Sequence, residues 1–141
     1  MRFLISAFAF LILVGCTATG PKFSELNAGL KPEPGKALVY VYRISTQMKG
    51  SGGTTPFVAG GQLVGELHTG GYLTHQMEPG IHKFHTDGMY VDQEFLLEVV
   101  EGETYYLKVF QEGFYLLTYY TVLVPEKQAL SEIQEMRYEG G

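Results

Sequence analysis

The sequence has a single cysteine and few basic side chains, and these two shortages exclude whole classes of protein. Cys16 is the only cysteine among 141 residues, so no disulfide can form within the chain. Ten lysine and arginine residues stand against fifteen aspartate and glutamate residues, which gives a formal charge of −5. The sequence also lacks a basic stripe with interleaved aromatic side chains, which binding to nucleic-acid phosphates requires. We therefore expect no nucleic-acid partner.

The N-terminal apolar run is too short to be a permanent membrane span. It extends from Phe3 to Val14 behind Arg2, whereas a transmembrane helix needs roughly 20 apolar residues. A basic start, a short apolar middle and a small residue before the cleavage point are typical of a secretory signal peptide. We interpret residues 1–15 as such a signal.

The segment Leu13-Val14-Gly15-Cys16 places the cysteine directly after a small residue. It resembles the bacterial lipobox, in which the cysteine thiol is diacylated, the preceding peptide is removed and the new amino terminus is acylated. We expect lipidation at Cys16, with ordinary signal cleavage near Ala18 as the alternative. Each buried methylene contributes about 0.8 kcal/mol, so two or three acyl chains would anchor the protein almost permanently. Thr17 stands where inner-membrane lipoproteins of Gram-negative bacteria often carry Asp, so the resemblance implies the outer membrane, facing the periplasm.

Residues 16–36 are rich in proline and glycine and are interpreted as a lipidated tether. Cleavage before Cys16 would leave nine basic and fifteen acidic residues, a formal charge of −6, in a chain of one domain. A flexible tether of this length has a reach on the order of 25 Å, which would let the domain stand clear of the membrane. In the alternative, Phe23 and Leu26 pack onto the domain and shorten that reach.

Residues 37–124 have the pattern of an all-β domain. The segment from Ala37 to Ile44 is β-branched and aromatic with apolar residues on both faces, as in a central strand. Turn signals then recur about every eight to twelve residues, which favours an antiparallel sandwich or barrel. These turn signals are Gly60-Gly61, Gly70-Gly71, Glu78-Pro79-Gly80 and Glu101-Gly102-Glu103.

The strands expected after residue 93 differ in whether one or both of their faces are apolar. Residues 94–99 alternate, which predicts one buried and one solvated face. Tyr105, Leu107 and Val109 are predicted to share a face. The run from Phe114 to Val124 is apolar on both faces, so we expect a helix or another subunit to cover its second side.

A single amphipathic helix is predicted over residues 125–139. Pro125 suits the first helical position, and apolar residues recur at three- and four-residue spacing from Ala129 to Met136. Glu126 and Arg137 lie at the ends that the helix dipole favours for their charges. We expect the helix to cover one end of the sheets, although the same apolar stripe could dock a partner.

Several motifs in the first three quarters of the chain resemble a bacterial lipoprotein family known only as a domain of unknown function, which is similar to PEGA-type and carboxypeptidase-regulatory-like modules. The resemblance implies a small antiparallel, seven-stranded, Ig-like β-sandwich and supplies no catalytic residues. It covers roughly Lys36 to Phe110, and it departs from such modules at Ala59-Gly60-Gly61-Gln62, where they usually carry an Asp-Gly or Asn-Gly turn. The motifs are Gly35 to Arg43, Val64 to Leu67, Gly71 to Leu73, Glu78 to His82 and Gly102 to Val109.

Neither an enzyme nor a metal protein is expected. No serine lies in a G-x-S-x-G elbow, and the carboxylates of residues 94–103 are explained by a solvated strand face and turn. His75 and His82 are weak metal candidates, because strands paired around residues 78–80 could bring them together. His85 would face away, and zinc needs three or four close ligands. We instead expect His82 to hydrogen-bond the backbone of the turn, and we expect no cofactor.

Function is therefore expected to reside in a surface. The first hypothesis is a non-enzymatic, lipid-anchored interaction module of the cell envelope, which binds an unidentified envelope protein through a sheet face and the Gly-rich loop of residues 49–55. The alternative is a periplasm-facing lipoprotein that binds a glycan or peptide on tyrosines, which suit both kinds of surface. The aromatic residues crowded into the second half are Tyr72, Tyr90, Tyr105, Tyr106, Phe110, Phe114, Tyr115, Tyr119 and Tyr120.

Overall fold

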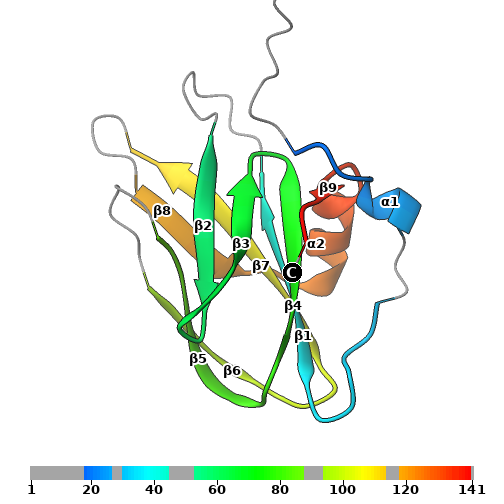
Figure 1. Ribbon diagram of the computed structural model, residues 1–141, viewed down its shortest axis with the longest axis vertical. Helices are drawn as coiled ribbons and strands as arrows, with labels where there is room; N and C mark the ends of the chain where they lie inside the picture. Colours follow the sequence, from blue (N-terminus) through cyan, green and yellow to red (C-terminus); the bar gives the residue numbers. More distant parts are fainter. Residues whose placement is uncertain (1–17, 27–29, 45–52, 88–93, 114–117, 141) are drawn as a thin grey trace, which may run out of the picture.

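The computed structural model describes residues 18–26, 30–44, 53–87, 94–113 and 118–140. Within these ranges the chain forms a two-layer β-sandwich with two short helices on one side (Figure 1). The proposed signal, Cys16, most of the Gly-rich loop, Tyr90, Phe114 and Tyr115 lie outside the described residues. None of the helices in the described ranges has the length and apolar character to cross a membrane.

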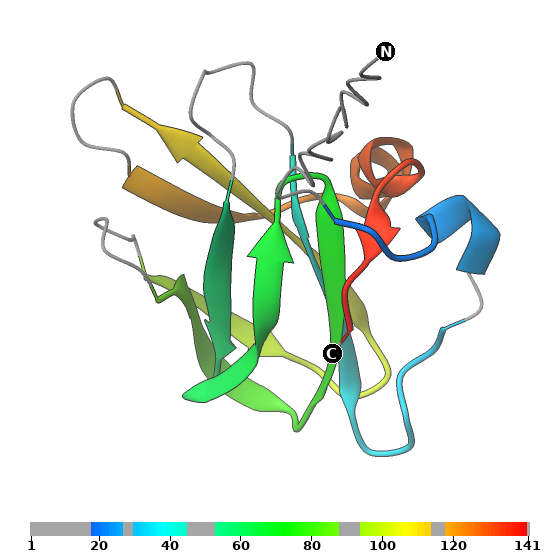
Figure 2. The ribbon, with the colours of Figure 1, turned by 45° about the horizontal axis from the view of Figure 1, so that its top comes forward.

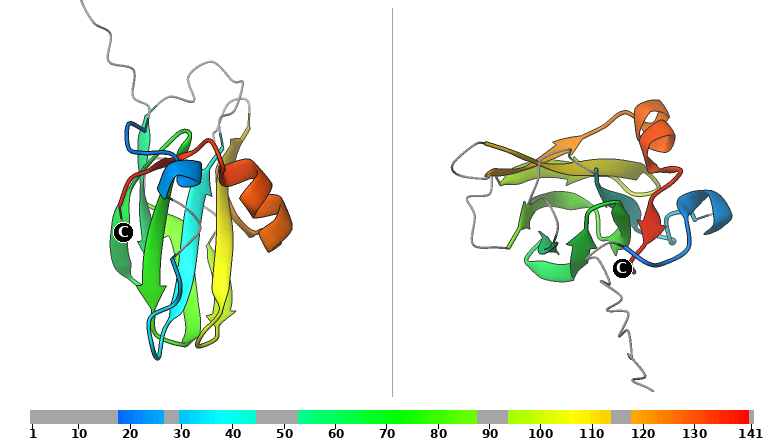
Figure 3. Two further views of the ribbon diagram at one scale, coloured as in Figure 1. Left: turned by 90° about the vertical axis from the view of Figure 1, so that its right-hand side faces the viewer. Right: turned by 90° about the horizontal axis from the view of Figure 1, so that it is seen from above.

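The two layers are a five-stranded and a four-stranded sheet (Figure 3, right). The first has the order β8 (Thr118–Leu123), β7 (Thr104–Glu112), β1 (Ala37–Arg43), β4 (Gly71–Met77), β9 (Arg137–Tyr138). The second has the order β3 (Gln62–His68), β2 (Thr54–Ala59), β5 (Gly80–Thr86), β6 (Phe95–Val99). Helix α1 (Phe23–Leu26) precedes the sheets, and α2 (Glu126–Ile133) lies between β8 and β9.

Strand β1 has the central place that its apolar character predicts, because every residue from Ala37 to Arg43 is buried. Side chains alternate along a strand, so Val39 and Val41 enter the core between the sheets while Tyr40 and Tyr42 reach the outer face. The outer face of the five-stranded sheet therefore requires a cover. Helices α1 and α2 supply it (Figure 3, left), and β9 runs between them (Figure 2).

The core between the sheets follows the predicted alternation. Phe57 and Phe84 from the four-stranded sheet meet Leu73 and Leu107 from the five-stranded sheet, and all four are fully buried. Residues 95–99 alternate between buried or half-buried and exposed positions. The prediction of an all-β sandwich with a C-terminal helix is confirmed at this level.

Three finer expectations about the fold are wrong. The five-stranded sheet is mixed, because β1 pairs with β7 in parallel and β4 pairs with β9 in parallel. The described residues contain nine strands where the resemblance implied seven. The helix predicted over 125–139 ends at Ile133, and residues 137–138 continue as a strand. The helical periodicity of the sequence extends past this point because Met136 is buried in the same outer cluster as Ala129 and Ile133.

The segment predicted to be a flexible tether is held against the domain along residues 18–26 and 30–36. Phe23 is 4% exposed, and its backbone N–H donates to the Met136 carbonyl at 2.8 Å. Further along, the Gln76 side chain bonds the Lys31 carbonyl and the Glu33 N–H, both at 3.0 Å. The alternative, in which Phe23 and Leu26 pack onto the domain, is therefore observed for Phe23, whereas Leu26 is 47% exposed. The outer sheet face offers apolar surface that a free tether would leave exposed to water.

The connection between β2 and β3 is the tight hairpin that its glycines predict. Gly60 and Gly61 have φ angles of 59° and 80°, and Ala59 pairs with Gln62. Two consecutive positive φ angles match the twist of a two-residue hairpin and strain any residue that has a side chain. This hairpin and the turn at Glu78-Pro79-Gly80 lie at the same end of the sandwich (Figure 1).

Candidate functional site

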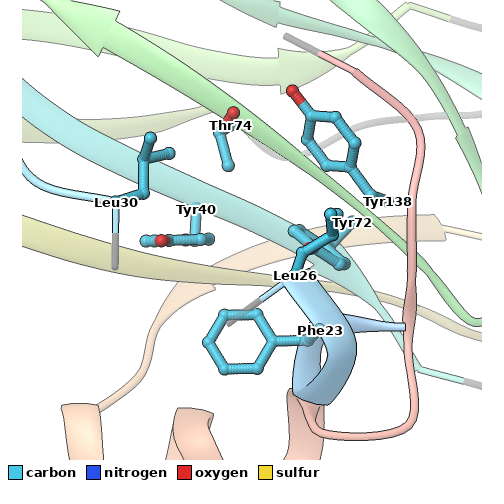
Figure 4. A pocket seen from close by; sticks show the side chains of 7 residues that line it. All are labelled: Phe23, Leu26, Leu30, Tyr40, Tyr72, Thr74 and Tyr138. Atoms are coloured by element: carbon cyan, nitrogen blue, oxygen red, sulfur yellow. The ribbon is translucent and has the colours of Figure 1, made fainter. Parts of the chain in front are cut away.

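A pocket of about 330 Å³ lies on the outer face of the five-stranded sheet, between the N-terminal segment and β9 (Figure 4). Its volume is at the lower end of the range for small-ligand sites. Its floor comes from β1 and β4, and its walls come from the segments before β1 and after α2. The lining residues are Phe23, Leu26, Leu30, Tyr40, Tyr72, Thr74 and Tyr138.

The floor of this tyrosine pocket is a layer of aromatic rings in contact with one another. The Phe23 ring makes edge contacts with Tyr40 and Tyr72, at centroid distances of 5.9 and 5.6 Å. Tyr40 also stacks on Tyr106 at 5.2 Å with an interplanar angle of 10°. Tyr40 and Tyr72 are 4% and 3% exposed, so little of either ring surface is accessible from the pocket.

The phenol groups of Tyr40 and Tyr72 in the pocket floor are uncharged at neutral pH. Burial raises the pKa of Tyr72 to about 12, with smaller contributions from Tyr40 and Tyr138. Burial likewise raises the pKa of Tyr40. Neutral hydroxyls can both donate and accept hydrogen bonds. The pocket therefore combines an apolar lining with a few uncharged polar atoms, which suits an apolar group that carries a single polar function.

The sequence pointed to only part of this pocket. Tyr72 belonged to the predicted aromatic surface, whereas Tyr40 and Tyr138 were not among its candidates. The missed signal is the alternation within β1, where Tyr40 lies between two inward-facing valines and so must face the other side. The remaining aromatic candidates on described residues are distributed over both faces, with Tyr119 in the inner core and Tyr106 in the outer cluster.

The two histidines proposed as weak metal candidates line a second pocket, of about 280 Å³, at the end of the sandwich that holds the β2–β3 hairpin. Strand pairing does not bring them together, because β4 and β5 belong to different sheets. His75 and His82 instead point inward from facing sheets. His75 is paired with the inward-facing Val39, and His82 is paired with the inward-facing Leu97.

The surroundings of His75 in this second pocket favour its neutral form. Burial lowers the pKa of His75, and the charges of His82 and Lys36 lower it further. His82 Nε2 donates to the Glu78 carbonyl at 2.7 Å, which confirms the expected bond to the turn backbone. In the described part of the chain no three His, Cys, Asp or Glu side chains gather as metal ligands would. His85 lies on the opposite face of β5 and contacts the Thr86 carbonyl.

The outer face of the four-stranded sheet is the third surface of interest, and it is exposed. Leu63, Ile81 and Leu96 are 58%, 73% and 65% exposed. Leu96 is opposite Lys83, and Ile81 is opposite Glu98, so apolar and charged side chains alternate across the face. This face therefore presents exposed apolar side chains separated by charged ones.

Comparison with known proteins places the chain in a family. A family model described as "Protein of unknown function (DUF2846)" matches residues 33–113. The chain belongs to this family. The DUF2846 region covers more than half of the chain, from the turn before β1 to the end of β7. No match to a curated protein or to a solved structure was found.

The tyrosine pocket straddles the limits of the DUF2846 region. Tyr40, Tyr72 and Thr74 of the floor lie within it, whereas the wall residues Phe23, Leu26, Leu30 and Tyr138 lie outside it. The family region therefore supplies an aromatic sheet face, and the flanking segments of this chain convert that face into a pocket.

Proposed function

We propose that this DUF2846 protein is a lipid-anchored accessory protein of the bacterial cell envelope, which acts without catalysis by binding an envelope protein. The observation that carries the proposal is the segment Leu13-Val14-Gly15-Cys16 behind a signal-like N-terminus. The proposed location is the outer membrane, facing the periplasm, because Thr17 follows the cysteine. Its membrane attachment is the acyl group on Cys16.

The test of the anchor compares three forms of the full chain in a Gram-negative host. Wild type is expected to incorporate labelled palmitate and sediment with membranes. Cys16→Ser is expected to lose both properties, because no other acyl acceptor is proposed. Thr17→Asp, the matched control, is expected to keep the label while moving to the inner membrane. Palmitate incorporation by Cys16→Ser would overturn the proposal.

The surface proposed to bind the partner is the outer face of the four-stranded sheet. Its exposed Leu63, Ile81 and Leu96 support this choice, because the corresponding face of the other sheet is covered by helices. A double Ile81→Glu, Leu96→Glu variant is expected to lose crosslinked products in intact membranes that wild type forms. Leu123→Glu is the matched control, since Leu123 is 47% exposed on the other sheet. Loss of the same products in both variants would refute this face.

A second candidate function is the binding of a small ligand in the tyrosine pocket. Of the two ligand classes, a peptide with an apolar side chain fits the pocket better than a glycan. Sugars stack on exposed ring faces, and the two tyrosines of the floor are 4% and 3% exposed. The walls instead offer Leu26 and Leu30, at 47% and 50% exposure.

This candidate is tested by tyrosine fluorescence of the protein during titration with apolar peptides and with peptidoglycan fragments. A saturable response to peptides that Leu30→Lys abolishes and Leu123→Lys preserves is expected if the pocket binds them. A response to glycan fragments alone would reject the preference for peptides.

A further inference from the structure

The N-terminal segment is fixed to the folded body almost as far back as the proposed anchor. Ala18 is 8% exposed and packs beside Gly71, where an added Cβ would lie 3.1 Å from the Ala18 Cβ. Gly20 is against the backbone of Tyr138, and the Tyr138 N–H donates to the Pro21 carbonyl at 2.8 Å. The chain is therefore fixed to the folded body at residues 18–21.

This immobilisation limits the distance between the domain and the membrane. Consecutive Cα atoms are about 3.8 Å apart, so the Cα atoms of Cys16 and Ala18 are separated by at most about 8 Å. The acyl chains on Cys16 enter the bilayer, and the cysteine backbone therefore remains at the headgroups. The part of the domain around Ala18 must lie within about 8 Å of that level, instead of the 25 Å that a flexible tether would allow.

The contacts of Ala18 identify which end of the sandwich this is. Gly71 begins β4, and the Gly70 N–H donates to the Arg43 carbonyl at the end of β1. Thr54, which begins β2, is paired with His68 at the end of β3, and so lies at the same end of the sandwich. Figure 1 shows residues 18–20 beside the β3–β4 turn, at the top of the molecule. We call this end, marked by Ala18, Thr54 and Gly71, the anchor end.

Within the described residues, the opposite end of the sandwich carries exposed acidic turns. The Gly102 N–H donates to the Lys36 carbonyl there, and the Gly60 N–H donates to the Lys83 carbonyl. Lys36 is paired with Glu33 at 3.0 Å, which leaves the other carboxylates in excess. The exposed acidic residues at this end are Glu33, Glu78, Glu98, Glu101 and Glu103.

Strand register separates the acidic turns from the bilayer in the orientation that the short connection imposes. Register places Thr54 and Ile81 about eight residues apart along the strands, or about 25 Å. The Debye length at physiological ionic strength is about 8 Å, so the acidic turns are about three Debye lengths from a bilayer at the anchor end. The reverse orientation would press these carboxylates against lipid phosphates.

We infer that the sandwich stands upright on the bilayer, with the anchor end in contact with the lipid headgroups and the acidic turns facing away. The inference rests on the proposed lipidation of Cys16. It assigns the anchor end to a lipid surface, and it directs the pocket of His75 and His82 away from the membrane. The outer face of the four-stranded sheet then runs along the membrane normal, where a neighbouring envelope protein can reach it.

The test uses the full acylated protein in vesicles of phosphatidylethanolamine and phosphatidylglycerol that contain a headgroup nitroxide lipid. Thr54→Cys and Ile81→Cys variants carry a maleimide fluorophore, which cannot react with an acylated Cys16 thiol. Both positions lie on the outer face of one sheet, at opposite ends. Because nitroxide quenching acts only at short range, the fluorophore at residue 54 is expected to be quenched at least threefold more strongly.

A linker variant provides the control. Insertion of about 15 Gly and Ser residues between Thr17 and Ala18 is expected to abolish the difference, because a flexible linker of that length releases the domain. Equal quenching at the two positions without the linker, with an intact mass that includes the acyl groups, would overturn the upright orientation and leave the anchor in place. An unmodified Cys16 in the mass spectrum would instead overturn the proposed function.

Discussion

The Arg137 guanidinium donates a hydrogen bond to the Gly20 carbonyl oxygen at 2.8 Å, across 117 positions in the sequence. This bond joins the two segments that flank the DUF2846 region. With the neighbouring bond between Tyr138 and Pro21, it makes β9 the element that holds the N-terminal segment to the domain. The distance between the membrane and the sandwich, in the proposed function, therefore depends on the C-terminal residues.

Gly20→Ala is expected to loosen this junction. An added Cβ would overlap the carbonyl oxygen of Tyr138. Because this contact is with backbone atoms rather than with a flexible side chain, the structure has little room to adjust. Such overpacking typically lowers the free energy of unfolding by about 1–3 kcal/mol. Urea denaturation of a Cys16→Ser form measures the change, and Ser24→Ala at an exposed position is the control. An unchanged urea midpoint in Gly20→Ala would contradict the close approach.

Phe23→Ala is expected to lower the free energy of unfolding by about 3–5 kcal/mol, because it removes a buried ring that contacts Tyr40 and Tyr72. Leu26→Ala is expected to change it by about 0.5 kcal/mol or less, since Leu26 is 47% exposed. Protease cleavage within residues 18–36 should accelerate in the first variant only. Equal sensitivity of the two variants would mean that the segment is not held by Phe23.

Glu132→Gln is expected to weaken the docking of α2. Burial by itself would raise the pKa of Glu132, but hydrogen bonds from Gln128, Tyr42 and Lys108 outweigh it and lower the pKa below its ordinary value of 4.5. The stabilisation is therefore present above about pH 4.5 and is lost as the pH falls through the lowered pKa.

The measurement for α2 is the urea midpoint at neutral and acid pH. Glu132→Gln should lose about 1–3 kcal/mol at neutral pH and show less further loss in acid than wild type. Glu135→Gln is the control, because the Glu135 side chain is 76% exposed in its pair with Lys22 and such pairs contribute little. If stability falls in parallel with acid for wild type and Glu132→Gln, the hydrogen bonds of Glu132 are not the cause of the acid loss.

Alkaline pH is expected to destabilise the protein through its buried tyrosines. Burial raises the pKa of Tyr72 and of Tyr106 to about 12, whereas an unfolded tyrosine ionises near pH 10. Their contribution is complete below pH 10 and is lost as the pH rises from about 10 to 12. Phenolate absorbance and urea midpoints across this range test the expectation. Tyr72→Phe should reduce the alkaline loss, and an unaltered profile would show that Tyr72 does not contribute.

The sequence predicted the elements that depend on local pattern. Apolar residues on both faces placed β1 at the centre of a sheet, and alternation identified the buried face of β6. Gly60-Gly61 predicted the hairpin because positive φ angles are a local requirement. Proline at the turn after β4 likewise allowed the bond of His82 to the turn backbone to be anticipated.

The arrangement of β1, β7 and β9 could not be read from the same patterns. Side chains alternate identically in parallel and antiparallel strands, so alternation carries no information about the direction of a neighbour. Residues 137–138 are too few to show a strand period, and their pairing with β4 depends on where α2 ends. For the same reason, no local signal placed Tyr138 beside Tyr72.

By itself the sequence determined an acidic, β-rich domain behind an N-terminal signal-like segment with one cysteine, because composition and period are properties of neighbouring residues. Only the tertiary structure decided that the proline-rich segment lies against the outer sheet face, that β9 holds it there, and that three distant tyrosines form one pocket. The physical reason is that the outward-facing tyrosines of β1 are buried by segments far apart in the chain. Which of these segments meet is set by packing across the whole molecule.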